Sequence, residues 1–540
     1  MAFSGALTLT DLNDFITPSQ ACIKPVTQTA IQLDRSGAYY EVTQDGKDVA
    51  PAPASMKKLE QAQINLNDCL ACSGCITSAE SVLITLQSHT EVLTFLESNK
   101  KILDASSAIS SSEVYKIPII SISPQTLASF AAATAASAST LSSPQHPTPR
   151  QILRRIRRFC IESLGFSLVF DTTFARHLAL QEHVAEFTER LDREKLERDV
   201  TNDSVDESRR GLPMLASACP GWICYAEKAH SEMLPLISRT KSPQQVMGTL
   251  IKNWMGARWG KGPSEIYHVT VMPCYDKKLE ASRKDFHNDM YSTRDVDCVI
   301  TTGELERLMK ENSWDITQPV PGELDNDLPT TSFGAFDPFY NAPYSANHAS
   351  MVDIPAIHFP ELLTHPGSSS GSYLHAIIAH LQATSDVPLT LNVEAVRGTD
   401  YEEYILTKNT GEPGNGKVVV FKGAKCYGFR NLQNVVRRVG RERERRYDYV
   451  EVMACPGGCV NGGGQLKPVI NAPSLPTTDS EGYKRNWEES GVAVAPIVKS
   501  FASIDVAQDA RWVREETRRR FFRTEYRAVE SEVAGLAVVW

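Results

Sequence analysis

Three closely spaced cysteines form the densest group of candidate metal ligands in the sequence. Cys69, Cys72 and Cys75 follow one another with two residues between neighbours. Zinc sites usually take cysteines as two separated pairs, whereas a tight three-cysteine repeat is typical of a compact iron-sulfur cluster. A fourth thiolate must come from elsewhere, and Cys22, in a proline-flanked segment, is the nearest candidate. The spacing therefore predicts a 4Fe-4S cluster on these four cysteines, with zinc or redox-active or inert thiols as the alternatives.

A second cysteine pair follows a stretch with the composition of a β-strand. Residues 447–453 are rich in aromatic and β-branched side chains, and the sequence Cys-Pro-Gly-Gly-Cys then places Cys455 and Cys459 directly after them. Binding sites of α/β proteins lie at the carboxyl ends of strands, and glycines allow backbone N–H groups to approach sulfur closely. This pattern favours a metal site, and the alternative is a glycine-rich turn with two inert cysteines.

Two further cysteines lie in similar local settings. Cys219 precedes a Pro-Gly turn, and Cys274 comes directly after the strand-like residues 266–272. Spacing alone indicates a structural role for each, because free cysteines are commonly buried. The cysteines without a partner at ligand spacing, which we expect to be core or surface thiols, are Cys160, Cys224, Cys298 and Cys426.

Length and composition limit the class of protein. The chain has 540 residues, which suggests three or four domains or lobes, and its 42% hydrophobic and 22% charged residues are typical of a soluble globular protein. A net charge of −9 argues against nucleic acid as the main partner. No apolar run reaches the roughly 18 residues of a membrane span, and the N-terminus lacks the basic start of a signal peptide. Free clustered thiols indicate a reducing compartment, so we expect cytoplasmic or nuclear residence.

The order of strand-like and helix-like segments predicts an α/β fold. Strands are expected at 116–122, 266–272, 296–300, 418–421 and 447–453, and helices at 151–158 and 430–440. The arginines of 151–158 are expected on a solvated helix face rather than in an RNA-binding patch. The expected domains are an N-terminal 4Fe-4S module (1–110), a first α/β lobe (115–245) with insertions near 131–149 and 190–210, a second α/β lobe (246–470), and a C-terminal helical wrap with a Trp-ended tail (471–540).

Several motifs together resemble the iron-only hydrogenase superfamily. They include residues 217–222, 241–245, 272–278 and 451–459, and the resemblance spans about residues 115 to 470. It implies a two-lobed core that buries a 4Fe-4S cluster. Its ligands would be Cys219, Cys274, Cys455 and Cys459. The resemblance, and not the spacing, brings Cys219 and Cys274 into this site.

The N-terminal residues narrow the resemblance. Residues 1–25 are similar to the eukaryotic hydrogenase-like cytosolic iron-sulfur cluster assembly factors, also called the nuclear prelamin A recognition factor-like family. This implies two 4Fe-4S clusters and a non-catalytic role in maturing extramitochondrial iron-sulfur proteins. It further implies that the protein links an early scaffold to a late targeting complex that includes a WD40 propeller protein. The apolar tail ending in Trp540 is then expected to dock on that complex, and the alternative is that it packs on its own core.

One position departs from the hydrogenase pattern. Ala218 stands where those enzymes commonly carry a cysteine that relays protons, and losing such a group typically costs about 100- to 10,000-fold in rate. By the same resemblance, Met272 and Lys277 match residues that line the diiron unit, Glu186 matches a carboxylate of the proton route, and His183 falls where a second carboxylate would be. We therefore expect no hydrogenase activity. The alternatives are an iron-only hydrogenase, an electron-transferring reductase, or a partner-binding protein with vestigial metal.

Overall fold

The computed structural model divides into two compact units, residues 1–82 and 83–540, which we describe separately. The described residues are 31–33, 39–41, 86–105, 114–138, 147–200, 211–324, 359–363, 365–409, 417–439, 447–466 and 515–528. In the first unit they form one antiparallel pair of strands, β1 (Ile31–Leu33) and β2 (Tyr39–Glu41). The predicted ligands Cys22, Cys69, Cys72 and Cys75, and the terminal Trp540, lie outside the described residues.

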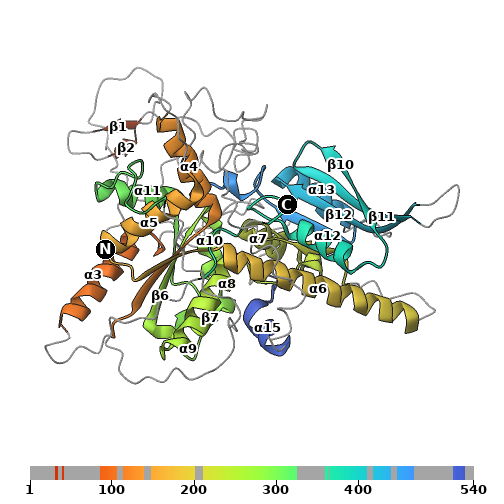
Figure 1. Ribbon diagram of the computed structural model, residues 1–540, viewed down its shortest axis with the longest axis horizontal. Coiled ribbons are helices and arrows are strands. Elements are labelled where there is room, and N and C mark those ends of the chain that lie inside the picture. The colour runs from red at the N-terminus through yellow and green to blue at the C-terminus, as the bar shows by residue number, and fades with distance from the viewer. Residues whose placement is uncertain are drawn as a thin grey trace, which may run out of the picture. The chain divides into compact units, whose positions relative to one another are not determined.

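The first sheet of the second unit is parallel throughout, in the order β4-β3-β6-β9. Its strand β6 is labelled in Figure 1. Its strands are β3 (Ile117–Ile122), β4 (Leu168–Asp171), β6 (Ile266–Met272) and β9 (Cys298–Thr301). All residues of β3, β6 and β9 are buried, as expected for a sheet that is covered on both faces. The predicted strands at 116–122, 266–272 and 296–300 are confirmed.

Helices cover both faces of this first sheet. On one face, Ile120 and Ile122 join a core with α3 (His89–Ala105), α4 (Pro124–Ala138), α5 (Pro149–Glu162) and α11 (Thr302–Glu311). On the other face, Ile119 packs with the first part of α6 (Thr173–Val200), α8 (Pro243–Thr249) and the π-helical turn Leu250–Met255 that continues it. This alternation follows from the period of two in a strand.

The second sheet is mixed, in the order β10-β11-β12-β13-β5. Its strands are β5 (Met214–Ala216), β10 (Leu389–Arg397), β11 (Tyr401–Asn409), β12 (Lys417–Tyr427) and β13 (Tyr449–Met453). The first three strands in that order are antiparallel, whereas β12, β13 and β5 run parallel. The predicted strands at 418–421 and 447–453 are therefore confirmed.

Each sheet takes strands from distant parts of the chain. Strand β5 lies within residues 115–245 but pairs with β13 of the second sheet, and strands β6 and β9 lie within residues 246–470 but belong to the first sheet. The chain thus crosses between the sheets more than once, because pairing between distant strands, and not chain order, sets each sheet.

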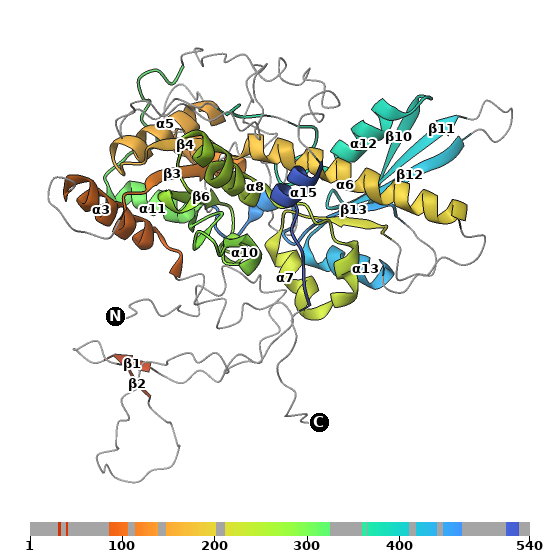
Figure 2. The ribbon, with the colours of Figure 1, turned by 90° about the horizontal axis from the view of Figure 1, so that it is seen from below.

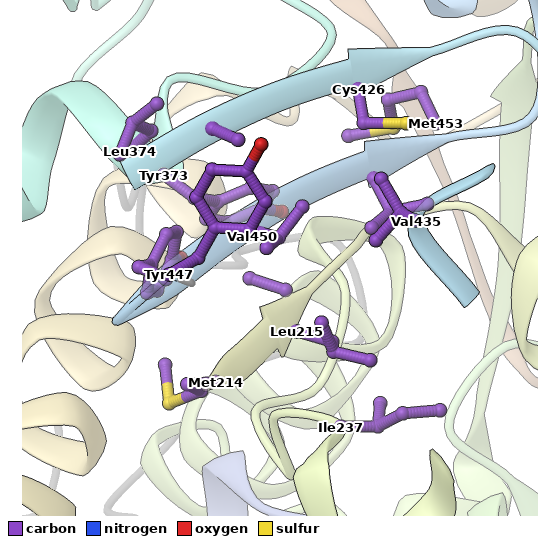
Figure 3. Close-up of a cluster of buried hydrophobic side chains, with 14 of the residues drawn as sticks. Met214, Leu215, Ile237, Tyr373, Leu374, Cys426, Val435, Tyr447, Val450 and Met453 are labelled. Atoms are coloured by element: carbon purple, nitrogen blue, oxygen red, sulfur yellow. The ribbon is translucent and has the colours of Figure 1, made fainter. Parts of the chain in front are cut away.

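Helices on opposite faces enclose the second sheet. Figure 2 shows α12 (Tyr373–Thr384) and α13 (Phe429–Val439) on opposite sides of its strands. Phe187 of α6 meets Phe421 and Tyr449 edge-on. Part of the resulting core is drawn in Figure 3, which labels Met214, Leu215, Ile237, Tyr373, Leu374, Cys426, Val435, Tyr447, Val450 and Met453. The predicted helix at 430–440 is confirmed by α13.

Helix α6 joins the two sheets. Its 28 residues span about 42 Å at 1.5 Å per residue. Phe174 near its start packs on the first sheet, and Phe187 packs on the second. The helix continues to Val200, so the first half of the insertion expected at 190–210 is helical, and residues 201–210 lie outside the described part.

The remaining elements are short and connect the larger ones. They are α7 (Pro220–Ala229), α9 (Gly256–Arg258), α10 (Asp276–Ala281), α15 (Glu515–Phe522), β7 (His287–Asn288), β8 (Thr293–Arg294), and the 3-10 turns Ser231–Leu236, Pro263–Glu265, Lys284–Phe286 and Cys459–Asn461. Within the described part of the chain, no helix has the length and apolar character needed to span a membrane.

The arginine-rich helix α5 differs from its expected solvated face at one position. Arg155 is only 5% exposed, and its guanidinium donates to both carboxylate oxygens of Glu323 at 2.8 Å. Arg158 instead pairs with Glu162 on the surface. The amphipathic pattern could not distinguish a buried, paired arginine from a solvated one, because the partner is far away in the sequence.

We expect Arg155→Met to lower the free energy of unfolding by about 3–5 kcal/mol, because it leaves the buried Glu323 carboxylate without its partner. The measurement is the urea unfolding transition. Arg158→Met is the matched control and should cost less than about 1 kcal/mol, because exposed ion pairs contribute little. Equal effects of the two substitutions would contradict the assignment of Arg155 to a buried pair.

Candidate metal centre

Cys219 lies between strand β5 and helix α7. It is the N-cap residue of α7, with extended backbone angles, and Pro220 occupies the first helical position. The Ser217 hydroxyl accepts a hydrogen bond from the Cys219 N–H at 2.9 Å and donates to the Val452 carbonyl at 2.5 Å. The thiol is therefore fixed at the carboxyl end of β5 and tied to the neighbouring strand β13.

Cys274 approaches from the other sheet. It follows the last residue of β6 and Pro273, and α10 begins two residues later. The Pro273 carbonyl accepts a hydrogen bond from the N–H of Gly464 at 2.9 Å, which ties this turn to the segment after Cys459. The Cys274 thiol is thus held where the first sheet meets residues from the second.

The remaining pair, Cys455 and Cys459, lies in the turn that follows β13. The N–H of Cys459 donates to Ser370 Oγ at 2.8 Å. Gly458 has a φ of +90°, and a Cβ there would lie 2.5 Å from the same Ser370 oxygen. Glycine is required at this position because a larger residue would displace the serine that holds Cys459.

The four cysteine side chains affect one another electrostatically. Burial raises the pKa of Cys274 well above its usual value, and Asp276, Cys219, Cys459 and Cys455 raise it further. Burial also raises the pKa of Cys455, with contributions from Cys219 and Cys459. The structure thus brings together the four described cysteines that the sequence analysis assigned to one site.

The local positive charge is already paired. Burial opposes the charge on Lys277, but Glu280 and the nearby thiols Cys274 and Cys459 raise its pKa above the usual value. Its ammonium group lies 2.8 Å from Glu280 Oε2. Thiolates at this site therefore require a further source of positive charge, which a metal group supplies.

The donor set is the one that iron-sulfur clusters use. Four cysteine thiols lie near enough for their charges to interact. Cysteine thiolates are the usual ligands of 4Fe-4S clusters, so the residues present fit such a cluster.

The helix that carries Cys219 and the helix that follows Cys274 lie in close contact. A Cβ at Gly221, in the first turn of α7, would lie 2.9 Å from Asp276 Oδ2 and 3.8 Å from the sulfur of Cys219. A side chain at this position would have to displace the Asp276 carboxylate, so glycine favours the close approach of α7 and α10. The Cys-Pro-Gly sequence therefore serves the contact between the sheets as well as the position of the thiol.

The two positions that the resemblance assigned to a proton route, Glu186 and His183, take part in other interactions. Burial alone would raise the pKa of Glu186, but Arg190 and the N–H of Arg239 lower it below the usual value. Its carboxylate accepts hydrogen bonds from Arg190 at 2.6 Å and Ser238 at 2.8 Å. Glu186 is therefore an ionised structural anchor and not an exposed helix charge.

His183 is a buried neutral side chain. It is 1% exposed, its ring lies tilted against the Tyr373 ring at 4.2 Å between centroids, and its Nδ1 is hydrogen-bonded to the Ala179 carbonyl. Burial lowers its pKa to about 4. Of the other matching positions, Met272 is 3% exposed in the core, and Ala218 is 8% exposed.

Sequence reasoning missed two residues that shape the site. Ser370 binds the backbone of Cys459, and Asp400 Oδ1 accepts a hydrogen bond from the N–H of Gly457 at 2.9 Å. Ser370 lies in a Gly/Ser-rich run that indicates only a turn, and Asp400 lies between β10 and β11. No spacing to the cysteines signals either residue, because both act from elsewhere in the chain.

We expect His183→Leu to reduce the loss of stability on acidification. The folded-state pKa of about 4 lies below the unfolded value near 6.5, so the unfolded state binds more protons between these pH values. As the pH falls from 6.5 to 4, the free energy of unfolding should therefore decrease by about 3 kcal/mol more in the wild-type protein than in the variant. Urea unfolding at both pH values measures this difference, and parallel pH profiles for the two proteins would contradict it.

Comparison with known proteins identifies the family. The family model "Iron only hydrogenase large subunit, C-terminal domain" matches residues 119–463. The "Cytosolic Fe-S cluster assembly factor NAR1" of Cryptococcus neoformans var. neoformans is 44% identical, over 92% of this chain and 80% of the relative. The "Cytosolic iron-sulfur assembly component 3" of Mus musculus is 40% identical, over 100% of this chain and 99% of the relative.

A solved structure shares the fold. A single-residue variant of the apo [FeFe]-hydrogenase HydA1 of Chlamydomonas reinhardtii aligns with a TM-score of 0.53 and 25% identity, over 82% of this chain and 99% of that chain. This confirms the expected hydrogenase-like α/β core. With two sheets whose strand ends bring four buried or partly buried cysteines together, and with relatives alike over nearly the whole chain, this protein belongs to the hydrogenase-like family of cytosolic iron-sulfur cluster assembly factors.

Proposed function

We propose that this protein is a carrier or adaptor in the assembly of cytosolic iron-sulfur proteins and that it holds two 4Fe-4S clusters. The observation that supports the proposal is that four cysteines from both sheets, one buried and three partly buried, lie near enough for their charges to interact. The names of the relatives, which are assembly factors, support the pathway. The place of action is then the cytosol, with the nucleus as a further expectation from the sequence.

The buried cluster would be held by Cys219, Cys274, Cys455 and Cys459. Its iron supplies the positive charge that keeps these thiols deprotonated in a buried setting. Because the ligands follow β5, β6 and β13, binding the cluster also joins the two sheets. We therefore assign this cluster to stabilising the fold.

The second cluster would be held by Cys22, Cys69, Cys72 and Cys75 in the N-terminal module. The three-cysteine repeat and the family membership support it. A cluster held by one short ladder is easier to reach than one enclosed between two sheets, so we assign loss or transfer to this cluster. The protein would thereby link an early scaffold to a late targeting complex that contains a WD40 propeller protein.

The proposed role is not catalytic. Ala218 has no proton to relay, and His183 is held neutral beside Tyr373. The rival assignment, an iron-only hydrogenase or an electron-transferring reductase, rests on the shared fold alone, which does not fix function. Iron beyond two clusters, with infrared bands of bound carbon monoxide or cyanide and evolution of hydrogen, would favour that rival.

We expect anaerobically purified protein to contain about eight iron and eight sulfide per chain. Cys22→Ala should remove about half of the iron and leave the thermal unfolding temperature unchanged, because the module it belongs to is separate. Cys219→Ala should remove about half of the iron and also lower the unfolding temperature and the soluble yield. Iron analysis and circular dichroism measure both results.

Two outcomes would contradict the two-cluster proposal. One is a chain that contains zinc or only a single cluster after oxygen-free purification. The other is equal stability of Cys22→Ala and Cys219→Ala, because the proposal assigns the structural role to the buried cluster alone.

We also propose that Trp540 anchors the protein to the targeting complex. Burying a Trp removes about 200 Å² from water, worth roughly 5 kcal/mol before ordering costs at ~25 cal/mol per Å². Trp540→Ala should therefore weaken capture of the complex in a pull-down at least about tenfold and leave the iron content unchanged. Val538→Ala is the matched control in the same tail, and unchanged capture by Trp540→Ala would refute the anchor.

A further inference from the structure

A short C-terminal segment, residues 520–527, runs across the second unit as a strap. It comprises the end of α15 and the extended residues that follow (Figure 2). The N–H of Lys241 donates to the Phe522 carbonyl at 2.7 Å, and the N–H of Thr524 donates to the Arg239 carbonyl at 2.7 Å. The strap is therefore fixed to residues 239–241 by backbone hydrogen bonds on both sides of Arg523.

The two ends of the strap reach the cores of different sheets. Phe522 is 4% exposed and packs in the core that α8 and the start of α6 form with the first sheet. Tyr526 is partly buried and packs against the core of the second sheet. Between them, Arg523 binds Glu182 and Glu189 of α6, the helix that joins the sheets, at 2.5 and 2.7 Å.

Tyr526 also packs against an ion pair that joins helix α7 to the segment after α10. The Arg283 guanidinium, in the segment after α10, donates to both carboxylate oxygens of Glu227 in α7, at 2.8 and 2.6 Å. The Tyr526 ring lies 5.5 Å from the centre of this guanidinium. The N–H of Arg527 donates to Glu227 at 3.3 Å, so the strap contacts both partners of the pair.

The ion pair lies along the same helix contact that positions two of the buried thiols. Helix α7 begins directly after Cys219, and α10 begins shortly after Cys274. Their first turns meet at Gly221 and Asp276. Separating α7 from α10 would therefore move Cys219 away from Cys274, and the strap opposes this separation.

We propose that the strap closes the contact between α7 and α10, with Tyr526 and Arg523 as positioning residues for the buried thiols. While the strap is seated, Cys219 and Cys274 keep their relative positions and the metal group is enclosed. When it is released, the two helices separate and the thiols become accessible to iron and sulfide or to a chelator. The part that concerns the metal group rests on the proposed function, whereas the closing of α7 on α10 does not.

The test compares hydrogen exchange and iron release in the full-length protein purified without oxygen. Tyr526→Ala should speed amide exchange in α7 and α10 about tenfold. In the wild type, local opening of these helices must break the contact between the Tyr526 ring and Arg283, and the variant lacks this contact. It should speed release of the more slowly lost half of the iron to a ferrous chelator by a similar factor. Exchange in β3 and β6 should stay as in the wild type.

Matched variants separate the strap from a general loss of stability. Tyr526→Phe keeps the ring over Arg283 and should behave as the wild type. Arg519→Ala removes an exposed contact of α15 with Glu189 and should leave exchange in α7 and α10 unchanged. If Tyr526→Ala does not fold, Tyr526→Leu, which keeps an apolar side chain, replaces it with the same expected changes.

Three results would overturn the strap proposal. They are unchanged exchange in α7 and α10 for Tyr526→Ala, the same acceleration in Tyr526→Phe, and the same acceleration in Arg519→Ala. Any of these results can be obtained with protein that contains about eight iron per chain. The strap proposal would then be refuted while the two-cluster proposal is retained. Conversely, faster exchange in a chain without iron would support the strap while refuting the clusters.

Discussion

Bringing several cysteine thiols together at one partly buried point raises the free-energy cost of ionising each of them. Each thiolate in a low-dielectric setting raises the cost of the next, and the pKa values of Cys274 and Cys455 rise accordingly. The nearby cation Lys277 is already paired with Glu280. These thiols are therefore favoured as neutral groups unless a positively charged metal group, as proposed, lies beside them.

Contacts that involve no sulfur bring the thiols together. Ser217 ties β5 to β13, and the absence of a side chain at Gly221 lets α7 approach Asp276. The Arg283–Glu227 pair holds the same two helices further along. Because these contacts lie on both sides of the junction between the sheets, the geometry of the site is a property of the junction and not of any single cysteine motif.

Strands β4, β5, β10 and β11 were not predicted from the sequence, and β10 is exposed along most of its length. The predicted strands at the centres of the two sheets were recognisable because each buries a continuous apolar run. This holds for β3 and β6, where every residue is buried, and for β13. Which sheet each strand joins was not predictable, because β5 pairs with β13 more than 200 positions away. For the same reason, spacing could not group Cys219 with Cys455. Only the resemblance to a family did so, and no local pattern marked Ser370, Asp400 or the partner of Arg155.

Glu186 has a structural role in this fold. Its carboxylate accepts hydrogen bonds from Arg190, Ser238 and the backbone of Arg239. An acceptor so fully engaged holds its charge in place instead of passing protons on. The residues it fixes, 238–240, adjoin those that pair with the C-terminal segment 520–527. Through these residues, the hydrogen bonds of Glu186 help to hold the C-terminal segment in place next to helix α6.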